Sequence, residues 1–245
     1  LDVHDSPDRV KTPLRRVPGT ERFEPISWDT AFREIGQRTR VIRERHGKHA
    51  VATFLGNPSA FSVAHAMFAS AFFKGLGTRN AYGSSTQDCS NKFAVAERMY
   101  GSAIHQPVPD LKRTQMVILI GTNPAISQMS FVHAPNAVDT LLGIEARGGR
   151  VVHVNPRRTE TAERVGEQVF IRPDTDVFFL LSFLQVMFAE HDPGAVPHVR
   201  GLSELRALVA PYSPERTEAV TRVPAGTLRE LVAAFLSARG ASVSP

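Results

Sequence analysis

An unbroken run of apolar side chains from Met116 to Ile120 is the clearest feature of the hydrophobic pattern. The run is rich in β-branched residues and ends at Gly121, which is typical of a strand buried on both faces of a parallel sheet. A second apolar run, Val151–Val154, has the same character, and helical spacing over 138–146 lies between the two. The pattern predicts one βαβ unit whose two strands each open into an Asn-Pro loop.

Strands and helices alternate over the rest of the chain. Further strands, short and apolar, are expected at 50–55 and 169–171, and a turn-rich segment at 80–85. Ser27 and Asp176 are suited to cap helices, and the segment 1–23, rich in Pro, Arg and Asp, is expected to be an irregular basic arm. Helical spacing predicts helices at 28–46, 61–74, 89–100, 177–188, 202–209, 214–220 and 227–238. The helix at 61–74 has small and apolar residues nearly all round, which predicts packing on more than one side.

This alternation predicts an α/β fold with doubly wound, mostly parallel sheets and flanking helices. Apolar residues make up 42% of the 245 positions, which is enough for a folded core. No apolar run approaches the length needed to cross a bilayer, so we expect no membrane insertion by this segment.

The chain is basic, with a formal charge of +5 and Lys and Arg densest at 9–22 and 33–48. Such an excess suits an anionic ligand, although solvated helix faces are the more common explanation. No aromatic-basic motif accompanies it, and nucleic acid is therefore not an expected partner. The single cysteine excludes a disulfide within the chain and a cysteine-based metal cluster made by this chain alone.

Three polar loops follow the predicted strands and would meet at one edge of the sheet, where open α/β sheets bind ligands. Glycine lets backbone N–H groups approach a phosphate, arginine provides forked donors for phosphate oxygens, and aspartate can accept hydrogen bonds from guanine. Each loop alone is more simply a turn or a helix cap, but three at successive strand ends favour a shared polar ligand. The candidate cofactor-binding residues are Gly121, Thr122, Asn123, Pro124, Asn155, Pro156, Arg157, Arg158, Thr159, Arg172, Asp174 and Asp176.

Cys89 is the candidate metal ligand and catalytic residue. A free cysteine is most often a small buried hydrophobic residue. This one follows a polar turn and stands near the start of a predicted helix, where the helix dipole favours the thiolate, a soft metal ligand. Lys92 lies one helical turn further on, and Asp88 is an alternative ligand. The histidines show no paired metal spacing and are expected to be structural or on the surface.

Several segments resemble, in the right order, the molybdopterin oxidoreductases of the dimethyl-sulfoxide-reductase superfamily, which include formate dehydrogenases and nitrate reductases. No segment is specific alone, but together they span nearly the whole chain. The segments are 9–16 (RVKTPLRR), 23–29 (FEPISWD), 120–124 (IGTNP), 154–162 (VNPRRTETA), 171–176 (IRPDTD), and 212–215 (YSPE) with Val223-Pro224.

The resemblance implies a bis(molybdopterin guanine dinucleotide) cofactor that holds Mo or W, bound by the three loops, with Cys89 at the position of the protein ligand to the metal. Cysteine there favours the formate or nitrate branch. It also implies an oxidoreductase that transfers two electrons or an oxygen atom to or from a small-molecule substrate. Residues 1–83 would form the first part of the family's α/β domain with its basic arm, and residues 84–245 a Rossmann-like domain that binds the guanine dinucleotide.

The chain departs from the family pattern in length. The four cysteines of the family's 4Fe-4S domain and the C-terminal domain that closes over the cofactor have no counterpart here. We therefore expect a central fragment, inactive alone, whose partners are the remaining domains of the same enzyme and an electron-transfer subunit. The expected compartment is the cytoplasm, with the periplasm as the alternative.

Two other functions fit parts of the sequence. The first is a non-catalytic nucleotide-binding module that keeps the Rossmann-like fold and uses no metal. The second is a nicotinamide-dependent dehydrogenase, which is disfavoured because neither G-x-G-x-x-G nor the P-loop pattern is present.

Overall fold

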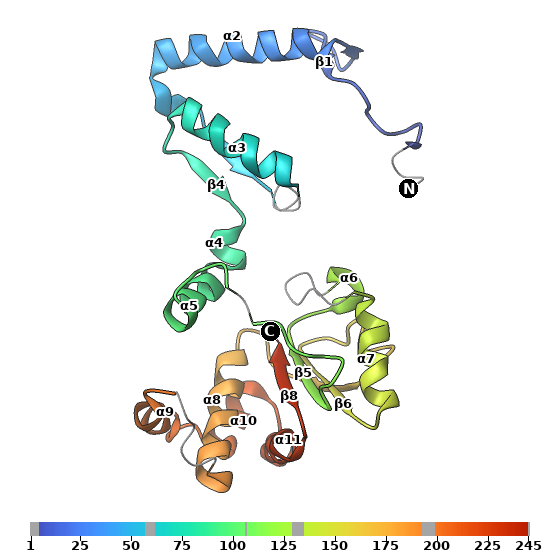
Figure 1. Cartoon of the computed structure of the whole chain (residues 1–245), viewed down its shortest axis with the longest axis vertical. Helices are drawn as coiled ribbons and strands as arrows, with labels where there is room; N and C mark the ends of the chain where they lie inside the picture. The colour runs from blue at the N-terminus through green and yellow to red at the C-terminus, as the bar shows by residue number, and fades with distance from the viewer. Residues whose placement is uncertain (1–4, 57–61, 106, 129–134, 193–198, 245) are drawn as a thin grey trace. The chain divides into compact units, whose positions relative to one another are not determined.

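The computed structural model describes residues 5–56, 62–105, 107–128, 135–192 and 199–244. The chain divides into two compact units, Leu1–Ile104 and His105–Pro245, which are described separately below (Figure 1). The predicted domain boundary at 83/84 stays a prediction.

The second unit is built on a four-stranded sheet in the order β7-β6-β5-β8. The strands are β5 (Met116–Ile120), β6 (Arg150–Asn155), β7 (Glu167–Phe170) and β8 (Ala241–Ser244). All three neighbouring pairs are parallel, and Met116 pairs with Arg150 at the start of the central ladder. The predicted βαβ unit is β5–α7–β6, with α7 at Ala137–Ala146.

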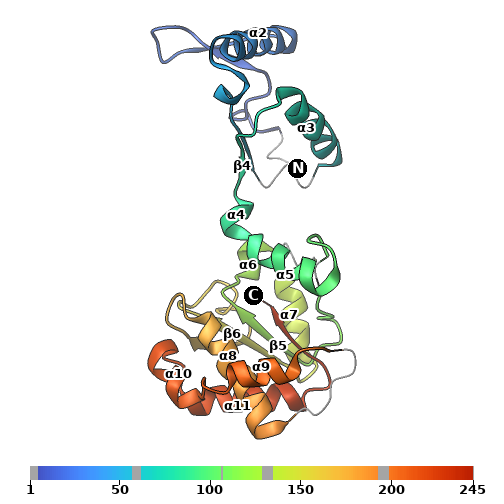
Figure 2. The same cartoon turned by 90° about the vertical axis from the view of Figure 1, so that its left-hand side faces the viewer.

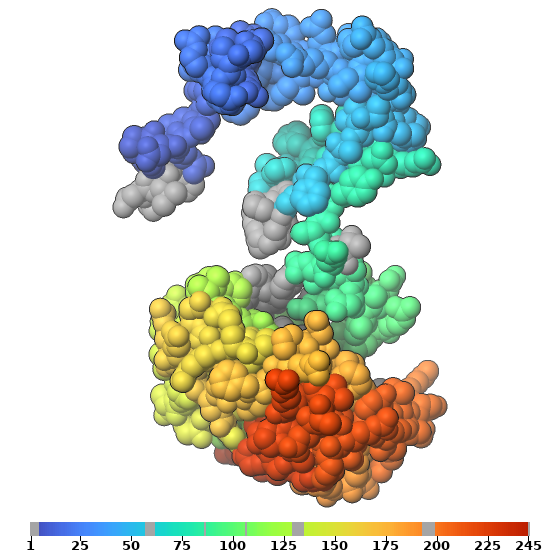
Figure 3. Space-filling model, turned by 180° about the vertical axis from the view of Figure 1, so that it is seen from behind, coloured from blue at the N-terminus to red at the C-terminus, as the bar shows by residue number. Residues whose placement is uncertain are grey.

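Helices cover both faces of this sheet. Helix α7 covers one face, and α8 (Asp176–Val186) and α11 (Ala225–Ser237) cover the other, with α10 (Pro214–Thr221) packed against these two helices (Figures 1 and 2). The short helix α6 (Pro124–Ser127), a π-helix η3 (Met187–His191) and α9 (Leu202–Val209) complete the unit. In the space-filling view, the orange and red atoms of the later helices form a continuous surface (Figure 3).

The core explains the five-residue apolar run of β5, because alternate side chains point to opposite faces of the sheet. Val117 and Leu119 pack in one cluster with Leu141 and Ile144 of α7. The other side chains of β5 pack in a second cluster with α8 and α11: Met116, Ile118 and Ile120 against Phe179, Phe183, Leu228 and Leu231. Burying each such side chain stabilises the fold by about 1.5–3 kcal/mol. The predicted doubly wound α/β fold is confirmed.

Three details of this unit differ from the prediction. The third strand is β7, Glu167–Phe170, so it begins two residues before the predicted start. Asp176 is the first residue of α8 and Thr175 stands at the N-cap, without a side-chain capping bond. Strand β8 was not predicted, because Ala-Ser-Val-Ser carries no apolar run and becomes a strand only by pairing with β5.

The first unit contains two small two-stranded sheets and several helices. Strand β1 (Leu14–Arg16) pairs antiparallel with β2 (Phe23–Pro25), and β3 (Thr53–Leu55) pairs parallel with β4 (Ala81–Gly83). The helical elements are α2 (Trp28–His46), the 3-10 turn η1 (Lys48–Ala50), α3 (Val63–Leu76), α4 (Ser85–Asp88) and α5 (Ser90–Tyr100). The cap prediction at Ser27 is confirmed, since its Oγ accepts from the N–H of Thr30 at 3.2 Å, and Gly47 follows the last residue of α2.

Four expectations for the first unit are wrong. The basic arm contains the β1–β2 hairpin, in which Arg15 forms ion pairs with Glu24 and Glu34. The segment 80–85 contains β4 rather than only a turn. Strand β3 is largely exposed rather than buried. Helix α3 buries only Leu76, and residue 61, its predicted start, lies outside the described residues. Apolar composition predicted burial here, but burial requires neighbouring elements that this unit does not supply.

Candidate functional site

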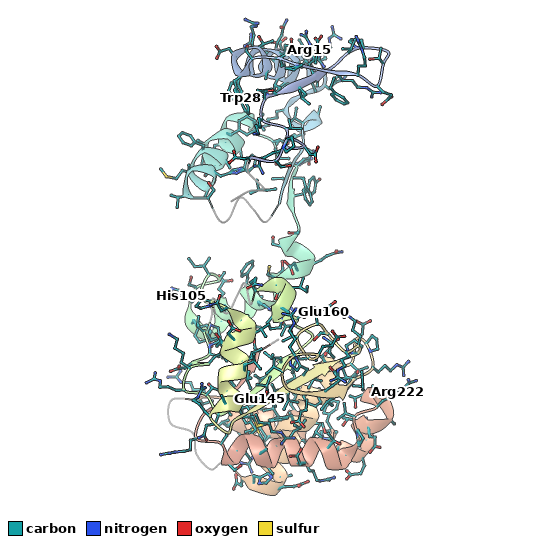
Figure 4. All side chains as sticks on the ribbon, turned by 90° about the vertical axis from the view of Figure 1, so that its right-hand side faces the viewer. Arg15, Trp28, His105, Glu145, Glu160 and Arg222 are labelled. Carbon is teal, nitrogen blue, oxygen red and sulfur yellow. The ribbon has the colours of Figure 1, made fainter. Side chains whose placement is uncertain are left out.

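The three predicted loops lie at one edge of the sheet. They follow β5, β6 and β7, which are parallel neighbours, so their carboxyl ends point the same way. The loop after β5 is 121–124, the loop after β6 begins at Pro156, and the loop after β7 begins at Ile171. Figure 4 shows Glu160 near α6 at this loop edge, whereas Glu145 lies toward the other end of α7.

Hydrogen bonds join the first two loops. Asn123 Nδ2 donates to Glu160 Oε2 at 2.6 Å, and Asn123 Oδ1 accepts from Thr161 Oγ1 at 2.7 Å and from the Thr161 N–H at 3.3 Å. Thr161 Oγ1 also accepts from the N–H of Ala125 at 2.9 Å. Thr161 is fully buried. We call this set of contacts between Asn123, Glu160 and Thr161 the loop clamp.

Glu160 is held as a carboxylate by its surroundings. Hydrogen bonds from its own backbone N–H, from Arg157 and from Asn123 lower the pKa of Glu160 to about 2. Arg157 forms an ion pair with it at 3.0 Å and donates a further hydrogen bond to the Arg158 carbonyl at 3.1 Å. Part of the Arg157 guanidinium therefore contacts the loop itself. Among the described residues, the Arg158 guanidinium makes one long hydrogen bond, to the Ala162 carbonyl at 3.4 Å.

Several predicted residues shape the loops from inside. Asn155 is buried and its Oδ1 accepts from the Arg157 N–H at 3.2 Å. Thr159 is also buried, and its Oγ1 accepts from the Ala162 N–H at 3.2 Å. Pro124 is buried at the start of α6. These side chains hold the loop conformation and do not face outward.

Gly121 follows β5 in a backbone conformation that suits glycine. Its φ of 69° lies in the left-handed region, which favours glycine, and an added Cβ would meet nothing within 4 Å. Its own N–H, however, donates to the Val154 carbonyl at 3.0 Å, so this group extends the sheet and is not available to a phosphate. The N–H groups near Gly121 that could approach a phosphate therefore do not include that of Gly121 itself, because the β5–β6 ladder continues one residue past the strand. The cofactor contact predicted at this loop stays a prediction.

The loop after β7 is fixed to helix α10. The Arg172 N–H donates to the Thr221 carbonyl at 2.8 Å, and Thr175 Oγ1 donates to the Arg172 carbonyl at 2.6 Å. Asp174 is exposed with a φ of 62°, and Asp176 is half-buried. Beside this loop lies a hollow of about 410 Å³, and the residues that line it are Pro156, Phe170, Ile171, Arg172, Pro173 and Arg222.

The sequence did not indicate four residues of this edge as functional: Glu160, Thr161, Phe170 and Arg222. The first two stand in the segment 154–162 that carried the resemblance, so the signal was present but their contacts with Asn123 were not visible. Phe170 and Arg222 had no local signal, because their positions beside the hollow depend on the packing of β7 and α10.

Cys89 lies in the first unit, between α4 and α5, at the N-cap of α5. Its side chain is 6% exposed and its Sγ lies 3.5 Å from Asp88 Oδ2. Burial raises the pKa of the Cys89 thiol, Asp88 raises it further, and Lys92 opposes them. The free side chain is therefore shifted toward the neutral thiol, because desolvation and a neighbouring carboxylate outweigh the position at a helix start. The role of Cys89 as metal ligand stays a prediction.

The described residues contain no group of three or more His, Cys, Asp and Glu side chains that could hold a metal ion. His153 is buried in β6 and its Nε2 lies 2.9 Å from the Val165 carbonyl. Burial lowers the pKa of His153, which agrees with the predicted structural role. None of the described helices has the length and apolar character of a membrane span.

Comparisons with known proteins agree on one family. The family described as molybdopterin oxidoreductase matches residues 9–193. Formate dehydrogenase H of Escherichia coli (strain K12) is 25% identical over 96% of this chain and 33% of its own length. A sulfite dehydrogenase subunit of Allochromatium vinosum is 34% identical over 72% of this chain and 18% of its own length.

A solved structure, acetylene hydratase from Pelobacter acetylenicus, superposes with a TM-score of 0.74 at 22% identity, over 98% of this chain and 32% of that one. That likeness concerns the fold. The chain spans about a third of the length of formate dehydrogenase H and of acetylene hydratase. The family implies a molybdopterin-type cofactor with Mo or W. On the family match and on the parallel α/β fold, this chain belongs to the molybdopterin oxidoreductase family.

Proposed function

We propose that this chain forms part of an oxidoreductase that binds bis(molybdopterin guanine dinucleotide) with Mo or W at the loop edge of the second unit. The observation that carries the proposal is the convergence of the loops after β5, β6 and β7 on one sheet edge, with exposed arginine and aspartate side chains. The oxidoreductase activity of the whole protein is part of the same proposal.

The chemistry of these loops fits a guanine dinucleotide. The guanidinium groups of Arg158 and Arg172 are exposed and suit phosphate oxygens. Asp174 and Asp176 offer carboxylate oxygens to the amino and imino groups of guanine. Thr122, half-buried at the end of β5, adds a hydroxyl at the same edge. The remaining predicted residues, including Asn123, Asn155 and Thr159, would support the site through the loop conformation.

Cys89 is the proposed protein ligand to the metal, with Asp88 as the alternative. A buried sulfur beside few other donors fits a metal whose remaining ligands come from the cofactor. A bound cation would favour the deprotonated thiol, in opposition to the raised pKa of the free side chain. The Mo or W centre, when bound, supplies the two-electron or oxygen-atom chemistry, and the protein residues hold and orient it.

The proposed substrate class is formate or nitrate, because cysteine stands at the ligand position and the relatives include a formate dehydrogenase and an assimilatory nitrate reductase. Other relatives are named as sulfite dehydrogenase, thiosulfate reductase and acetylene hydratase, so the family alone does not select the substrate. The proposed partners are further domains of the same enzyme, with a 4Fe-4S cluster, and an electron-transfer subunit, in the cytoplasm or periplasm.

The test uses the whole polypeptide that carries this segment. Metal analysis should find Mo or W, and acid release should yield guanine nucleotide in a 2:1 ratio to metal, as two dinucleotides per metal require. Cys89→Ala should abolish formate or nitrate turnover and change the electron paramagnetic resonance spectrum of the metal, while Asp88→Asn should leave that spectrum closer to wild type. Absence of metal and pterin from active wild-type protein would reject the proposal.

A further inference from the structure

Arg222 has an unusual backbone conformation for its residue type. Helix α10 ends at this residue, which has a φ of 64° and a ψ of 12° and whose N–H donates to the Glu218 carbonyl. This left-handed position after a helix is most often glycine, because a side chain with a Cβ is disfavoured there. Such unfavourable conformations concentrate at functional sites, so the choice of arginine here calls for a reason.

The surroundings of Arg222 supply that reason. Arg222 and Arg172 line the same hollow, and among the residues that the structure describes neither guanidinium has an ion pair or a hydrogen-bond partner. Elsewhere in this unit, Arg150 and Arg229 each form ion pairs with two glutamates. Two cations that line one hollow without a carboxylate partner favour an anion between them.

The backbone brings the two arginines together. The Arg172 N–H donates to the Thr221 carbonyl at 2.8 Å, so a backbone hydrogen bond links the loop after β7 to the end of α10 beside Arg222. The rest of the hollow is apolar, and Phe170 is 58% exposed within it. An exposed aromatic ring beside guanidinium groups suits a ligand with a planar apolar part and a charged part, as in a nucleotide.

We propose that Arg222, together with Arg172, binds a phosphate group of a nucleotide whose base or sugar lies over Phe170. This inference rests on the proposed function, in which the guanine dinucleotide portion of the cofactor is that ligand, and it names Arg222 and Phe170 as residues of the same site. Arg222 reaches the site from α10, outside the three loops.

The experiment uses the whole polypeptide, produced in cells that cannot make molybdopterin, with guanosine diphosphate as the probe in calorimetric titration. Arg222→Gly should weaken binding about tenfold or more, the usual effect of losing a charge-assisted contact. Its thermal unfolding temperature should stay the same or rise, since glycine adopts a φ of 64° freely. Arg222→Asn, which also tolerates this conformation, is the second variant.

The matched control is Arg164→Gln, which removes an exposed positive charge away from the hollow and should leave the affinity within about twofold. Guanosine without phosphate should bind wild type and Arg222→Gly alike. Phe170→Ala should weaken the binding of guanosine diphosphate more than the binding of inorganic pyrophosphate.

The outcomes separate this inference from the proposed function. Unchanged affinity in Arg222→Gly and Arg222→Asn, or no binding of guanosine diphosphate to wild type, would overturn the inference, even if the holoenzyme contains Mo or W and pterin. Binding that depends on Arg222, in a protein whose native form lacks metal and pterin, would support the inference and reject the proposed function.

Discussion

Asn123 Nδ2 donates a hydrogen bond to Glu160 Oε2 at 2.6 Å and thereby joins the loops that follow β5 and β6. The amide oxygen of Asn123 accepts two further hydrogen bonds from Thr161. The side chain that the sequence marked as a cofactor contact is thus engaged within the protein. We infer that Asn123 supports the site by holding its loops in place.

Removing the hydroxyl of the loop clamp should destabilise the second unit. Thr161→Val keeps the shape of the side chain but removes the hydroxyl at a buried position. The Ala125 N–H then loses its acceptor, and Asn123 Oδ1 keeps only the long hydrogen bond from the N–H of residue 161. The expected loss in the free energy of unfolding is about 1–3 kcal/mol. Denaturant unfolding of wild type and variant measures this difference.

Thr161→Ser is the matched control, because it retains the hydroxyl and removes one methyl group. It should restore most of the stability lost in Thr161→Val. Equal stability of Thr161→Val and wild type would contradict the clamp.

The stability that the loop clamp contributes should depend on pH, because Glu160 is part of it. Its pKa is lowered from 4.5 to about 2 in the folded chain. A lowered folded pKa means that the carboxylate contributes stability above about pH 4.5, and that this contribution disappears as the pH falls toward 2. Glu160→Gln should therefore unfold at a lower temperature than wild type at neutral pH, and the difference should shrink on acidification. A difference that is constant over this range would contradict the assignment.

Gly149 sets the start of β6 close to the end of α7. A Cβ at this position would lie 2.5 Å from the Gln115 carbonyl oxygen and 2.7 Å from Ile144 Cγ2. Gly149→Ala should therefore force the strand or helix to shift and destabilise the unit by about 1–3 kcal/mol. Thermal unfolding followed by circular dichroism measures the change.

Gly143 offers the matched comparison, since it lies within α7 and an added Cβ would meet only the flexible end of Arg147 at 3.4 Å. Gly143→Ala should stabilise the helix by about 0.5–1 kcal/mol. Destabilisation by both alanines to the same extent would show that the close approach at Gly149 is not the cause.

The thiol of Cys89 should react slowly with alkylating reagents in the absence of a metal. Burial and Asp88 raise the pKa of its thiol, so less thiolate is present at neutral pH than for a free cysteine. The 245-residue chain contains no other cysteine, and its alkylation rate therefore reports this side chain alone. The native chain should react more slowly than the urea-unfolded chain, and Asp88→Asn should react faster than wild type. A native rate equal to the unfolded rate would contradict the burial.

Several features of the fold could be predicted from local pattern. The apolar runs of β5 and β6, the helical spacing of α7 and the glycines after strands and helices all appear in the structure near their predicted positions. These predictions succeed because a strand buried on both faces requires an unbroken apolar run. A helix that buries one face requires apolar residues that recur about every 3.6 positions. The loop edge follows as well, since parallel neighbours place their carboxyl ends together.

Other features depended on contacts between distant segments. Strand β8 exists because it pairs with β5, and the thiol of Cys89 is shifted toward the protonated form because its surroundings exclude water. The exposure of α3 and β3 depends on which elements surround them, which their own composition does not specify.

The sequence by itself determined the α/β fold class, the positions of the three loops and the family that the chain resembles. Only the tertiary structure decided which loop side chains face inward: Asn123 toward Glu160 and Thr161, and Asn155 toward Arg157. It also brought Arg222 from the end of α10 to the hollow beside Arg172. The physical reason is that periodicity records whether a side chain meets apolar surroundings, whereas the partner of a polar side chain depends on the position of residues far away in the chain.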